Sequence, residues 1–287
     1  MTAPSRPVLG LTVGDPAGIG PEIVGACLAD PHLPQECDYR VIGTARGFAA
    51  GRPDSASARA SWEALKEAAK LLENGGIAGV VTGPVSKEGL HNVGFPFPGQ
   101  TEFFAARSGT DNYAMCLTGG PLTVGLVTIH VALRDVPRLL KKEEIVRTGK
   151  LLARFVGRRR GRAPRVAVAG LNPHAGEGGL FGNEENEVIA PAVEELAREG
   201  DFSGPHAPDT VFHRAIQGEF DAVLCMYHDQ GLIPLKLLAF DSGVNVTLGL
   251  PFPRTSPDHG TGFDIAGTGR ANHASMLAAI RLAVELL

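Results

Sequence analysis

The sequence predicts an α/β protein in which helices cover a mostly parallel β-sheet. Short apolar runs, typical of buried strands, alternate along the chain with segments whose apolar residues recur at helical spacing. Glycine and proline are abundant, at 37 and 21 residues, and they cluster at the junctions between these runs. Strand-end loops of this composition suit tight turns and a close approach of the backbone to a ligand.

The N-terminal half has clear helix boundaries. Pro21 fits the first turn of a helix, Asn74-Gly75 is a stop signal, and Thr101 is expected to cap a short helix that ends before Gly109. Residues 49–60 are expected to form a flexible loop. The elements expected here are strands at 8–13, 39–43 and 77–82 and helices at 21–29, 61–73 and from 101.

The C-terminal half begins with a predicted β-hairpin, in which 113–118 and 122–129 pair around Gly119-Gly120. Strand-like and helical segments then alternate, which favours parallel strands joined by crossover helices. The elements expected after the hairpin are strands at 165–171, 220–226 and 244–248 and helices at 143–156, from about 184, at 209–217 and from about 272.

The composition excludes several classes of protein. With 287 residues, of which 44% are hydrophobic, the chain is long enough for one large globular domain or two smaller ones. A net charge of −4 gives no reason to expect nucleic acid or an anionic membrane as a partner. The arginine-rich run from Arg154 to Arg165 has Phe155 as its one aromatic residue, so it is expected to be a solvated helix end and turn.

The sequence gives no sign of export or of a membrane span. The apolar stretches 76–85 and 231–240 are too short to cross a bilayer, and the N-terminal segment has no charged leader followed by an apolar block. The four cysteines lie far apart without a C-x-x-C pair, which disfavours a disulfide framework. A reducing cytoplasm is therefore the expected compartment.

Three histidines follow strand-like apolar runs: His130, His174 and His228. Ligands of open α/β sheets bind in the crevice outside the carboxyl ends of the strands. Three imidazoles brought to that edge could share one divalent metal ion with an open coordination position, as in a catalytic site. The residues alone leave an alternative open, because a histidine at a strand end is often only a hydrogen-bonded loop residue.

Lys236 and Asp229 are two further candidates for chemistry. Lys236 lies in the apolar run 231–240, where an amine is seldom buried without a partner. Its amine could bind an anion or transfer a proton, or it could reach solvent along a helix surface. Asp229 directly follows His228 and could orient a ligand or shift protons, or it could cap the next turn.

Asn245 and Arg254 flank the loop after the strand expected at 244–248. An arginine there suits bidentate recognition of a phosphate or carboxylate, although an ordinary surface arginine would fit the local sequence as well. No G-x-G-x-x-G motif follows the first strand, and the glycine-rich segment 14–20 matches neither the Rossmann spacing nor the P-loop. A nucleotide must therefore be held in another way.

Five sequence blocks closely resemble the 4-hydroxythreonine-4-phosphate dehydrogenase family of pyridoxal phosphate biosynthesis. The blocks are long and unusual, and the similarity runs over nearly the whole chain. They are GDPAGIGPE (14–22), TGPVSKEGL (82–90), GLNPHAGEGG (170–179), MYHDQG (226–231) and TLGLPFPRTSPDHGT (247–261).

The resemblance implies a two-domain α/β/α sandwich of the isocitrate/isopropylmalate dehydrogenase-like type, with the active site in the interdomain cleft. Residues 1–120 plus 255–287 would form the first α/β domain, which carries the cofactor loop. Residues 121–254 would form the second, which carries most metal and substrate ligands and the dimer interface. Members of the family form homodimers with the active site at the subunit interface. They require NAD and one divalent metal ion, zinc, magnesium or cobalt, per active site.

The resemblance also implies roles for individual residues. The metal ligands would be His130 and His174 of one subunit and His228 of the other. The substrate contacts would be Gln100, Thr101, Lys236, Asn245 and Arg254. The cofactor contacts would be His259, Gly260, Asp264 and Asn272, in the HGTGFDIAG loop and just after it. Lys236 and Asp229 are the expected catalytic residues.

The implied reaction is the NAD-dependent oxidation of 4-phosphooxy-L-threonine, a small anionic substrate. Its β-keto acid product decarboxylates to 3-amino-2-oxopropyl phosphate. Two features depart from the family pattern. Gln100 replaces the family's histidine and cannot carry a positive charge, and the chain lacks some tens of residues near 49–60.

Both departures point to alternative substrates. A paralogue would oxidise 4-phospho-D-threonate or erythronate, or a cis-dihydrodiol of an aromatic dicarboxylate. A metal-dependent lyase or hydrolase without NAD is a further alternative, and so is a non-catalytic metabolite-binding protein. The HGTGFDIAG loop argues against the first of these two, and the set of three histidines argues against the second.

Overall fold

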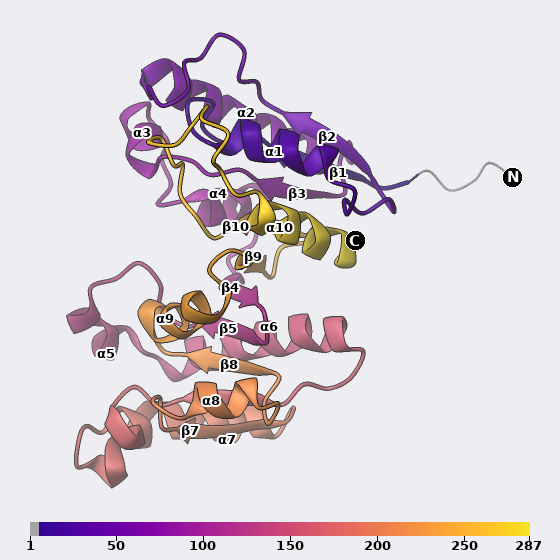
Figure 1. Cartoon of the computed structure of the whole chain (residues 1–287). Coiled ribbons are helices and arrows are strands. Elements are labelled where there is room, and N and C mark those ends of the chain that lie inside the picture. The colour runs from indigo at the N-terminus through magenta and orange to yellow at the C-terminus, as the bar shows by residue number, and fades with distance from the viewer. Residues whose placement is uncertain (1–5) are drawn as a thin grey trace, which may run out of the picture. The chain divides into compact units, whose positions relative to one another are not determined.

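The computed structural model describes residues 6–287, and the chain divides into two compact units. The first unit joins the N-terminal part of the chain, up to Asp111, with Val244–Leu287, and the second unit is Asn112–Gly243 (Figure 1). Residues 1–5 lie outside the described range. They are the first part of the N-terminal segment in which the sequence predicts no leader. Over residues 6–287, no helix is long and apolar enough to cross a membrane.

The sheet of the first unit has the strand order β2-β1-β3-β10-β9. Its strands are parallel except β9, which runs antiparallel to β10. The strands are β1 (Val8–Thr12), β2 (Asp38–Ile42), β3 (Gly79–Thr82), β9 (Val244–Leu248) and β10 (Arg254–Pro257). The helices are α1 (Gly20–Ala29), α2 (Ser55–Glu73), α3 (Lys87–Asn92), α4 (Gln100–Arg107) and α10 (Ala274–Glu285).

Aromatic rings anchor α4 in the core of the first unit. Trp62 of α2 contacts Phe95 and Phe103 edge-on, with ring centroids 4.7 and 5.1 Å away. Phe103 also packs against Phe104, and both side chains are fully buried. Edge-to-face pairs of this kind add to the stabilisation from buried area. The packing therefore fixes the helix that carries Thr101 near its first turn.

The sheet of the second unit has the strand order β4-β5-β8-β6-β7. β4 and β5 form the predicted antiparallel hairpin, and the remaining pairs are parallel. The strands are β4 (Ala114–Gly119), β5 (Leu122–Leu126), β6 (Val166–Ala169), β7 (Phe202–His206) and β8 (Ala222–Cys225). The helices are α5 (Val136–Leu139), α6 (Lys142–Arg160), α7 (Ala190–Ala197), α8 (Val211–Ile216) and α9 (His228–Ala239), with 3₁₀ or π turns at Leu133–Asp135, Pro173–Gly179 and Glu185–Ile189.

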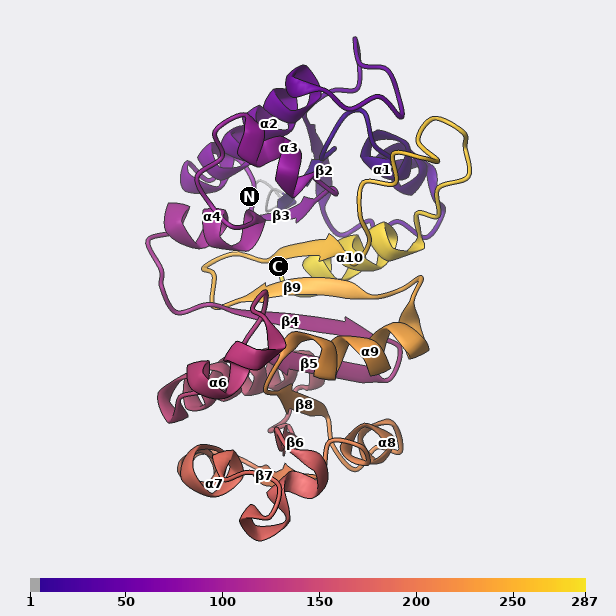
Figure 2. The ribbon, with the colours of Figure 1, turned by 90° about the vertical axis from the view of Figure 1, so that its left-hand side faces the viewer.

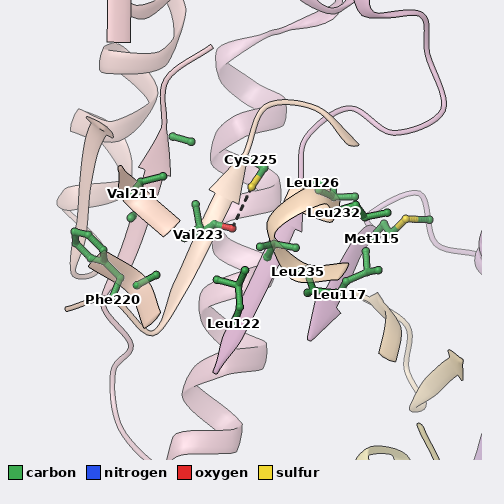
Figure 3. Packing of buried hydrophobic residues seen from close by; sticks show 14 residues of the cluster. Met115, Leu117, Leu122, Leu126, Val211, Phe220, Val223, Cys225, Leu232 and Leu235 are labelled. Carbon is green, nitrogen blue, oxygen red and sulfur yellow. Dashed lines mark hydrogen bonds between the residues drawn. The ribbon is translucent and has the colours of Figure 1, made fainter. Parts of the chain in front are cut away.

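Helices cover both faces of this second sheet. In Figure 2, α6 and α7 lie on one face and α8 and α9 on the other. Leu122 and Leu126 of β5 point toward Leu232 and Leu235 of α9 (Figure 3). Alternate residues of a strand share a face, so the spacing of the β5 leucines matches the covered face. The prediction of a mostly parallel sheet with helices on its faces is confirmed in this unit.

Several local predictions about the elements are wrong. The N-cap of α4 is Gly99 and not Thr101, and the helices α3, α5 and α9 have no counterpart in the prediction. α2 begins at Ser55, not at residue 61, because Asp54 caps it: the Asp54 carboxylate accepts a hydrogen bond from the Ser57 N–H at 2.7 Å, and the Ser57 hydroxyl accepts one from the Asp54 N–H at 3.2 Å. The expected flexible loop is thus confined to the residues before Ser55. β7 and β10 have no counterpart in the prediction, because each is short and contains a proline, which argues against a strand.

The unit boundaries lie at 111/112 and 243/244, whereas the sequence favours boundaries at 120/121 and 254/255. Each of the expected boundaries cuts a pair of antiparallel neighbours, β4–β5 and β9–β10. Strands joined by a short turn form a local ladder, so each pair stays within one unit. Arg254 consequently belongs to the first unit, with Thr101 and Asn245, and not to the unit that holds the histidines.

The arginine-rich run is a helix end and turn, as predicted, and part of it surrounds a buried carboxylate. Asp221, just before β8, has a side chain only 2% exposed, and Arg160, Arg162 and Arg165 lie within 3.5 Å of its oxygens. Burial raises the pKa of Asp221, but the hydrogen bonds from Arg162 and Arg165 outweigh it and lower the pKa to about 2. These contacts join the end of α6 to the starts of β6 and β8.

We expect Asp221→Asn to destabilise the protein by about 2 kcal/mol at neutral pH. The folded-state pKa lies below the ordinary value of 3.8, so the stabilisation is present above about pH 4 and is lost between about pH 4 and 2. Urea unfolding of both proteins across this range measures the difference. Glu63→Gln, which removes an exposed carboxylate, is the control. Equal stability of Asp221→Asn and wild type at pH 7 would contradict the expectation.

Candidate active site

The structure brings two of the three candidate histidines together. The ring centroids of His130 and His228 lie 5.5 Å apart, with the planes tilted by 44°. They meet because His130 follows β5 and His228 follows β8, and these strands are parallel neighbours. That His130 and His174 of one subunit are completed by His228 of the other remains a prediction, but within one chain it is His130 and His228 that lie close together. Among residues 6–287, no group of three or more potential ligands is arranged to hold a metal ion.

The geometry of this pair fits a shared metal ion. A metal–imidazole bond of about 2.1 Å places two rings that bind one ion with their centroids roughly 5–6 Å apart. The Nδ1 atom of His228 lies 2.7 Å from Oδ1 of Asp229. Because a carboxylate only accepts, it holds the proton on Nδ1 and leaves Nε2 of His228 available as a ligand. Asp229 thus contacts His228 and orients it, one of the roles that the sequence left open.

A chain of buried hydrogen bonds connects the three strand ends that precede the histidines. The Thr128 hydroxyl, after β5, donates to the carbonyl of Met226 at 2.7 Å. The Met226 N–H, after β8, donates to Oε1 of Gln230, and Nε2 of Gln230 donates to the carbonyl of Gly170 after β6, both at 2.7 Å. Gln230 is buried and has no role in the sequence prediction. Its place in the MYHDQG block is the only signal for it.

His174 lies in a left-handed turn at the end of β6. Residues 174–178 all have positive φ, between 43° and 79°, and three of them are not glycine: His174, Ala175 and Glu177. The left-handed region is unfavourable for L-residues by about 1–2 kcal/mol each. Backbone strain of this kind is found at functional sites where the surrounding structure holds it. The His174 side chain is exposed and lies 6.2 Å from the ring of Phe181, centroid to centroid.

Arg254 forms the centre of a second group, in the first unit. Its side chain is buried, at 3% exposure. Nη2 donates to the Thr82 hydroxyl at 2.7 Å, and Nη1 donates to the hydroxyls of Thr247 at 3.2 Å and Thr101 at 3.4 Å. Every one of these acceptors is neutral, and the guanidinium Nε has no partner. A buried cation with only neutral partners is unfavourable, so the group suits an incoming anion.

Electrostatics and polar atoms around Arg254 agree with an anion site. Burial lowers the pKa of Arg254 to about 10, opposed by the nearby Glu102 carboxylate, so the guanidinium is charged at neutral pH. The buried Oδ1 of Asn245, on the adjacent strand, lacks a hydrogen-bond partner, so it can accept from a hydroxyl or ammonium group of the same ligand and does not itself contact the anion. Thr82 and Thr247 are additions to the predicted site. Both are strand residues within the TGPVSKEGL and TLGLPFPRTSPDHGT blocks, but nothing in the local pattern shows that they face Arg254.

Gln100, a predicted substrate contact, lies beside Arg254. Its Oε1 accepts from Nη2 of Arg254 at 3.4 Å, and its Nε2 donates to the carbonyl of Gly83 at 3.4 Å. The amide is therefore held between the two groups and brings no second positive charge to the anion site. Lys236, by contrast, lies on α9 in the second unit, where it is partly buried.

The candidate cofactor loop is rich in glycine and contacts the GDPAGIGPE block. The Ile19 N–H donates to the Thr261 carbonyl at 2.8 Å. His259 Nδ1 lies 3.1 Å from the Gly260 carbonyl, which requires the proton on Nδ1 and leaves the buried Nε2 as an acceptor without a donor. Asp264 is exposed, and Asn272 accepts a hydrogen bond from the Ala274 N–H at the start of α10. The unused acceptor of His259 fits a nucleotide that offers a donor.

Comparison with known proteins identifies the family. The sequence model of the family described as "Pyridoxal phosphate biosynthetic protein PdxA" matches residues 26–283. The chain belongs to this PdxA family. A protein from Geobacter metallireducens named 4-hydroxythreonine-4-phosphate dehydrogenase is 46% identical, over 98% of this chain and 96% of its own length. The alignment spans 325 positions, so it includes residues that this 287-residue chain lacks.

Solved structures of PdxA relatives share the fold. 4-Hydroxythreonine-4-phosphate dehydrogenase from Klebsiella pneumoniae is 37% identical with a TM-score of 0.82, covering 98% of this chain and 99% of its own. A terephthalate 1,2-cis-dihydrodiol dehydrogenase from Burkholderia xenovorans is 29% identical with a TM-score of 0.68, covering 97% of both. Isocitrate dehydrogenase from Methylococcus capsulatus, 17% identical with a TM-score of 0.53 over 97% of this chain and 85% of its own, shares the fold alone. The family prediction is confirmed.

We expect Arg254→Met to weaken binding of inorganic phosphate about 10- to 100-fold, because it removes a charged hydrogen-bond donor. Stability should change little, since the substitution replaces a buried cation by an apolar side chain of similar length. Isothermal titration with phosphate and thermal unfolding measure the two effects. Arg40→Met, at an exposed arginine, should leave the phosphate affinity unchanged. An unaltered affinity in Arg254→Met would remove the guanidinium from the anion site.

Proposed function

We propose that this PdxA-family chain is an NAD-dependent, divalent-metal-dependent dehydrogenase that acts on 4-phosphooxy-L-threonine. The substrate hydroxyl is oxidised and the β-keto acid then loses CO2 to give 3-amino-2-oxopropyl phosphate, a step of pyridoxine 5'-phosphate formation. The observation that carries the proposal is the buried Arg254, whose partners are all neutral. The relatives' names, which are those of dehydrogenases of a phosphorylated substrate, support the same reaction class.

The residues of the first unit would bind the anionic end of the substrate. Arg254 supplies the positive charge and its orphaned Nε donor, while the hydroxyl of Thr101 and the amide of Asn245 complete the contacts. Gln100 would donate or accept a hydrogen bond without adding charge. The cofactor contacts would be His259, Gly260, Asp264 and Asn272. The bound nicotinamide supplies the hydride acceptor.

The residues of the second unit would hold the metal and move the proton. His130 and His228 would bind the ion with His174, and a divalent ion at such a site acts as a Lewis acid for the substrate hydroxyl. Asp229 keeps the proton on Nδ1 of His228. Lys236, on the helix that begins with His228, is our candidate for the group that takes the hydroxyl proton. Imidazole ligands favour zinc, and magnesium or cobalt are the alternatives.

A second copy of the chain is the proposed partner. A hollow of about 600 Å³ in the second unit is lined by His174, Tyr227, Asp229 and Ile233, among others. Apolar side chains of α9 that line it, and one just after the helix, are unusually exposed: Ile233 at 67%, Leu237 at 86% and Phe240 at 73%. Contiguous exposed apolar surface marks an interaction site. We infer that a homodimer covers this surface in the cytoplasm, and that the partner supplies His174 to a site containing His130 and His228.

A different substrate is the alternative function. The similarity to a terephthalate cis-dihydrodiol dehydrogenase and the neutral Gln100 both fit an aromatic dicarboxylate dihydrodiol. Gln100 is also the reason to consider 4-phospho-D-threonate or erythronate as the substrate of a paralogue. The alternatives differ from the main proposal only in what is oxidised, since each uses NAD and the metal.

We expect NADH absorbance to appear when the protein is mixed with NAD, Zn²⁺ or Mg²⁺ and 4-phosphooxy-L-threonine. The rate should fall by at least about 1,000-fold in His174→Ala, which removes a metal ligand. Gln100→His should raise kcat/KM for phosphorylated substrates, because it restores a group that can be charged. A higher rate with a dihydrodiol or phosphothreonate would support the paralogue. Consumption of the substrate without formation of NADH would support a lyase or hydrolase. If no substrate is consumed, a binding protein is supported.

Mixed dimers of inactive variants decide which subunit supplies which histidine. If His130 and His228 come from one chain and His174 from its partner, mixing His130→Ala with His174→Ala restores up to about a quarter of wild-type activity, since a two-fold dimer then has one intact site. Mixing His130→Ala with His228→Ala restores none. The opposite result would support His130 and His174 as the pair from one chain. No restoration in either mixture would contradict a shared site.

A further inference from the structure

The buried carboxylate of Glu185 contacts the segment that leads into the His174 turn. Glu185 begins the π-helical turn before α7 and is only 2% exposed. Its Oε1 accepts hydrogen bonds from the backbone N–H groups of Leu171 and Asn172, both at 2.7 Å. Its Oε2 accepts a third from Nδ2 of Asn172 at 3.0 Å. All three bonds join Glu185 to the residues just before His174.

Glu185 also contacts the turn on the other side of His174. A β-carbon at Gly176 would lie 2.7 Å from Oε2 of Glu185, so the carboxylate packs directly against this glycine backbone. A buried carboxylate is unfavourable unless hydrogen bonds satisfy its oxygens. Here the donors come from one segment only, and they are amide groups. The charge of Glu185 is thus directed at the backbone that flanks His174.

The turn requires such a contact from outside. Its left-handed conformation is disfavoured at His174, Ala175 and Glu177, which all have a β-carbon. The residue before the segment is fixed as well, because Gln230 donates to the carbonyl of Gly170 at 2.7 Å. The backbone from Gly170 to Gly176 is therefore held by buried polar side chains.

We propose that Glu185 is a positioning residue, which holds the His174 turn in the conformation that presents the imidazole to the metal. The proposal rests on the assignment of His174 as a metal ligand under Proposed function. Glu185 takes no part in proton transfer. It acts through the backbone, so its removal changes metal affinity through the geometry of His174.

The test compares zinc binding and amide exchange in full-length variants. Glu185→Ala should bind Zn²⁺ about 10- to 100-fold more weakly than wild type in competition with a chelator, the effect typical of residues that orient metal ligands. Hydrogen exchange at Leu171 and Asn172 should accelerate. Two controls come from the same segment: Glu187→Ala removes an exposed carboxylate, and Ile189→Ala removes a buried side chain. Both should retain zinc affinity within about threefold, although Ile189→Ala is less stable.

The outcomes separate positioning from general stability. Wild-type zinc affinity in Glu185→Ala, when His174→Ala has lost it, would overturn the proposal, as would an equal loss of affinity in Ile189→Ala. If Glu185→Ala does not fold, the Glu185→Gln variant tests the proposal instead. Its side-chain oxygen can still accept from both backbone N–H groups, but its NH2 group then faces Nδ2 of Asn172, and two donors cannot form a hydrogen bond. The proposal requires zinc binding at least about threefold weaker than wild type, and wild-type affinity overturns it.

A different experimental result would show that the proposed function, and not the role of Glu185, is wrong. If His174→Ala binds Zn²⁺ as tightly as wild type, the metal assignment is wrong and the positioning role has no ligand to serve. The exchange rates at Leu171 and Asn172 still report whether Glu185 holds the turn. The two claims are therefore tested independently by the same set of proteins.

Discussion

The parallel pairing of β5, β8 and β6 is the constraint on which the candidate metal site depends. Parallel neighbours end at the same edge of a sheet, so His130 and His228, which directly follow two of these strands, are brought together although they lie far apart in the chain. Hydrogen bonds through Met226 and Gln230 then fix the three strand ends relative to one another. The sheet sets the positions of the backbones, and the loops set where the rings of His130, His174 and His228 point.

Two buried charges show how structural and binding roles differ. Asp221 is surrounded by arginines, and its hydrogen bonds compensate for its burial. Arg254 is equally buried, but its partners are hydroxyl and amide oxygens and one of its nitrogens has no partner. A buried charge that is fully paired stabilises the fold, whereas one left with neutral partners retains attraction for a ligand of opposite charge. This contrast is the physical basis for assigning substrate binding to Arg254.

Much of the fold could be predicted from local patterns. The hairpin of β4 and β5, the other strands apart from β7 and β10, and the family are encoded in runs of consecutive residues, so periodicity and motif were sufficient for them. Errors arose where local signals conflict with tertiary contacts. β7 and β10 contain prolines and are too short to show a pattern, yet neighbouring strands recruit them. The start of α2 depends on a capping box made by Asp54 and Ser57. The usual sequence signature of a capping box is Ser or Thr followed three residues later by Glu or Gln, so this pair does not match it.

By itself, the sequence determined the family, the α/β class and which residue types are available for chemistry. Only the tertiary structure decided which of them meet. It paired His130 with His228, placed Thr82 and Thr247 around Arg254, and directed Glu185 at the backbone before His174. The reason is that these contacts join residues distant in the chain. Their geometry follows from strand order and buried hydrogen bonding, neither of which leaves a periodic trace in the sequence.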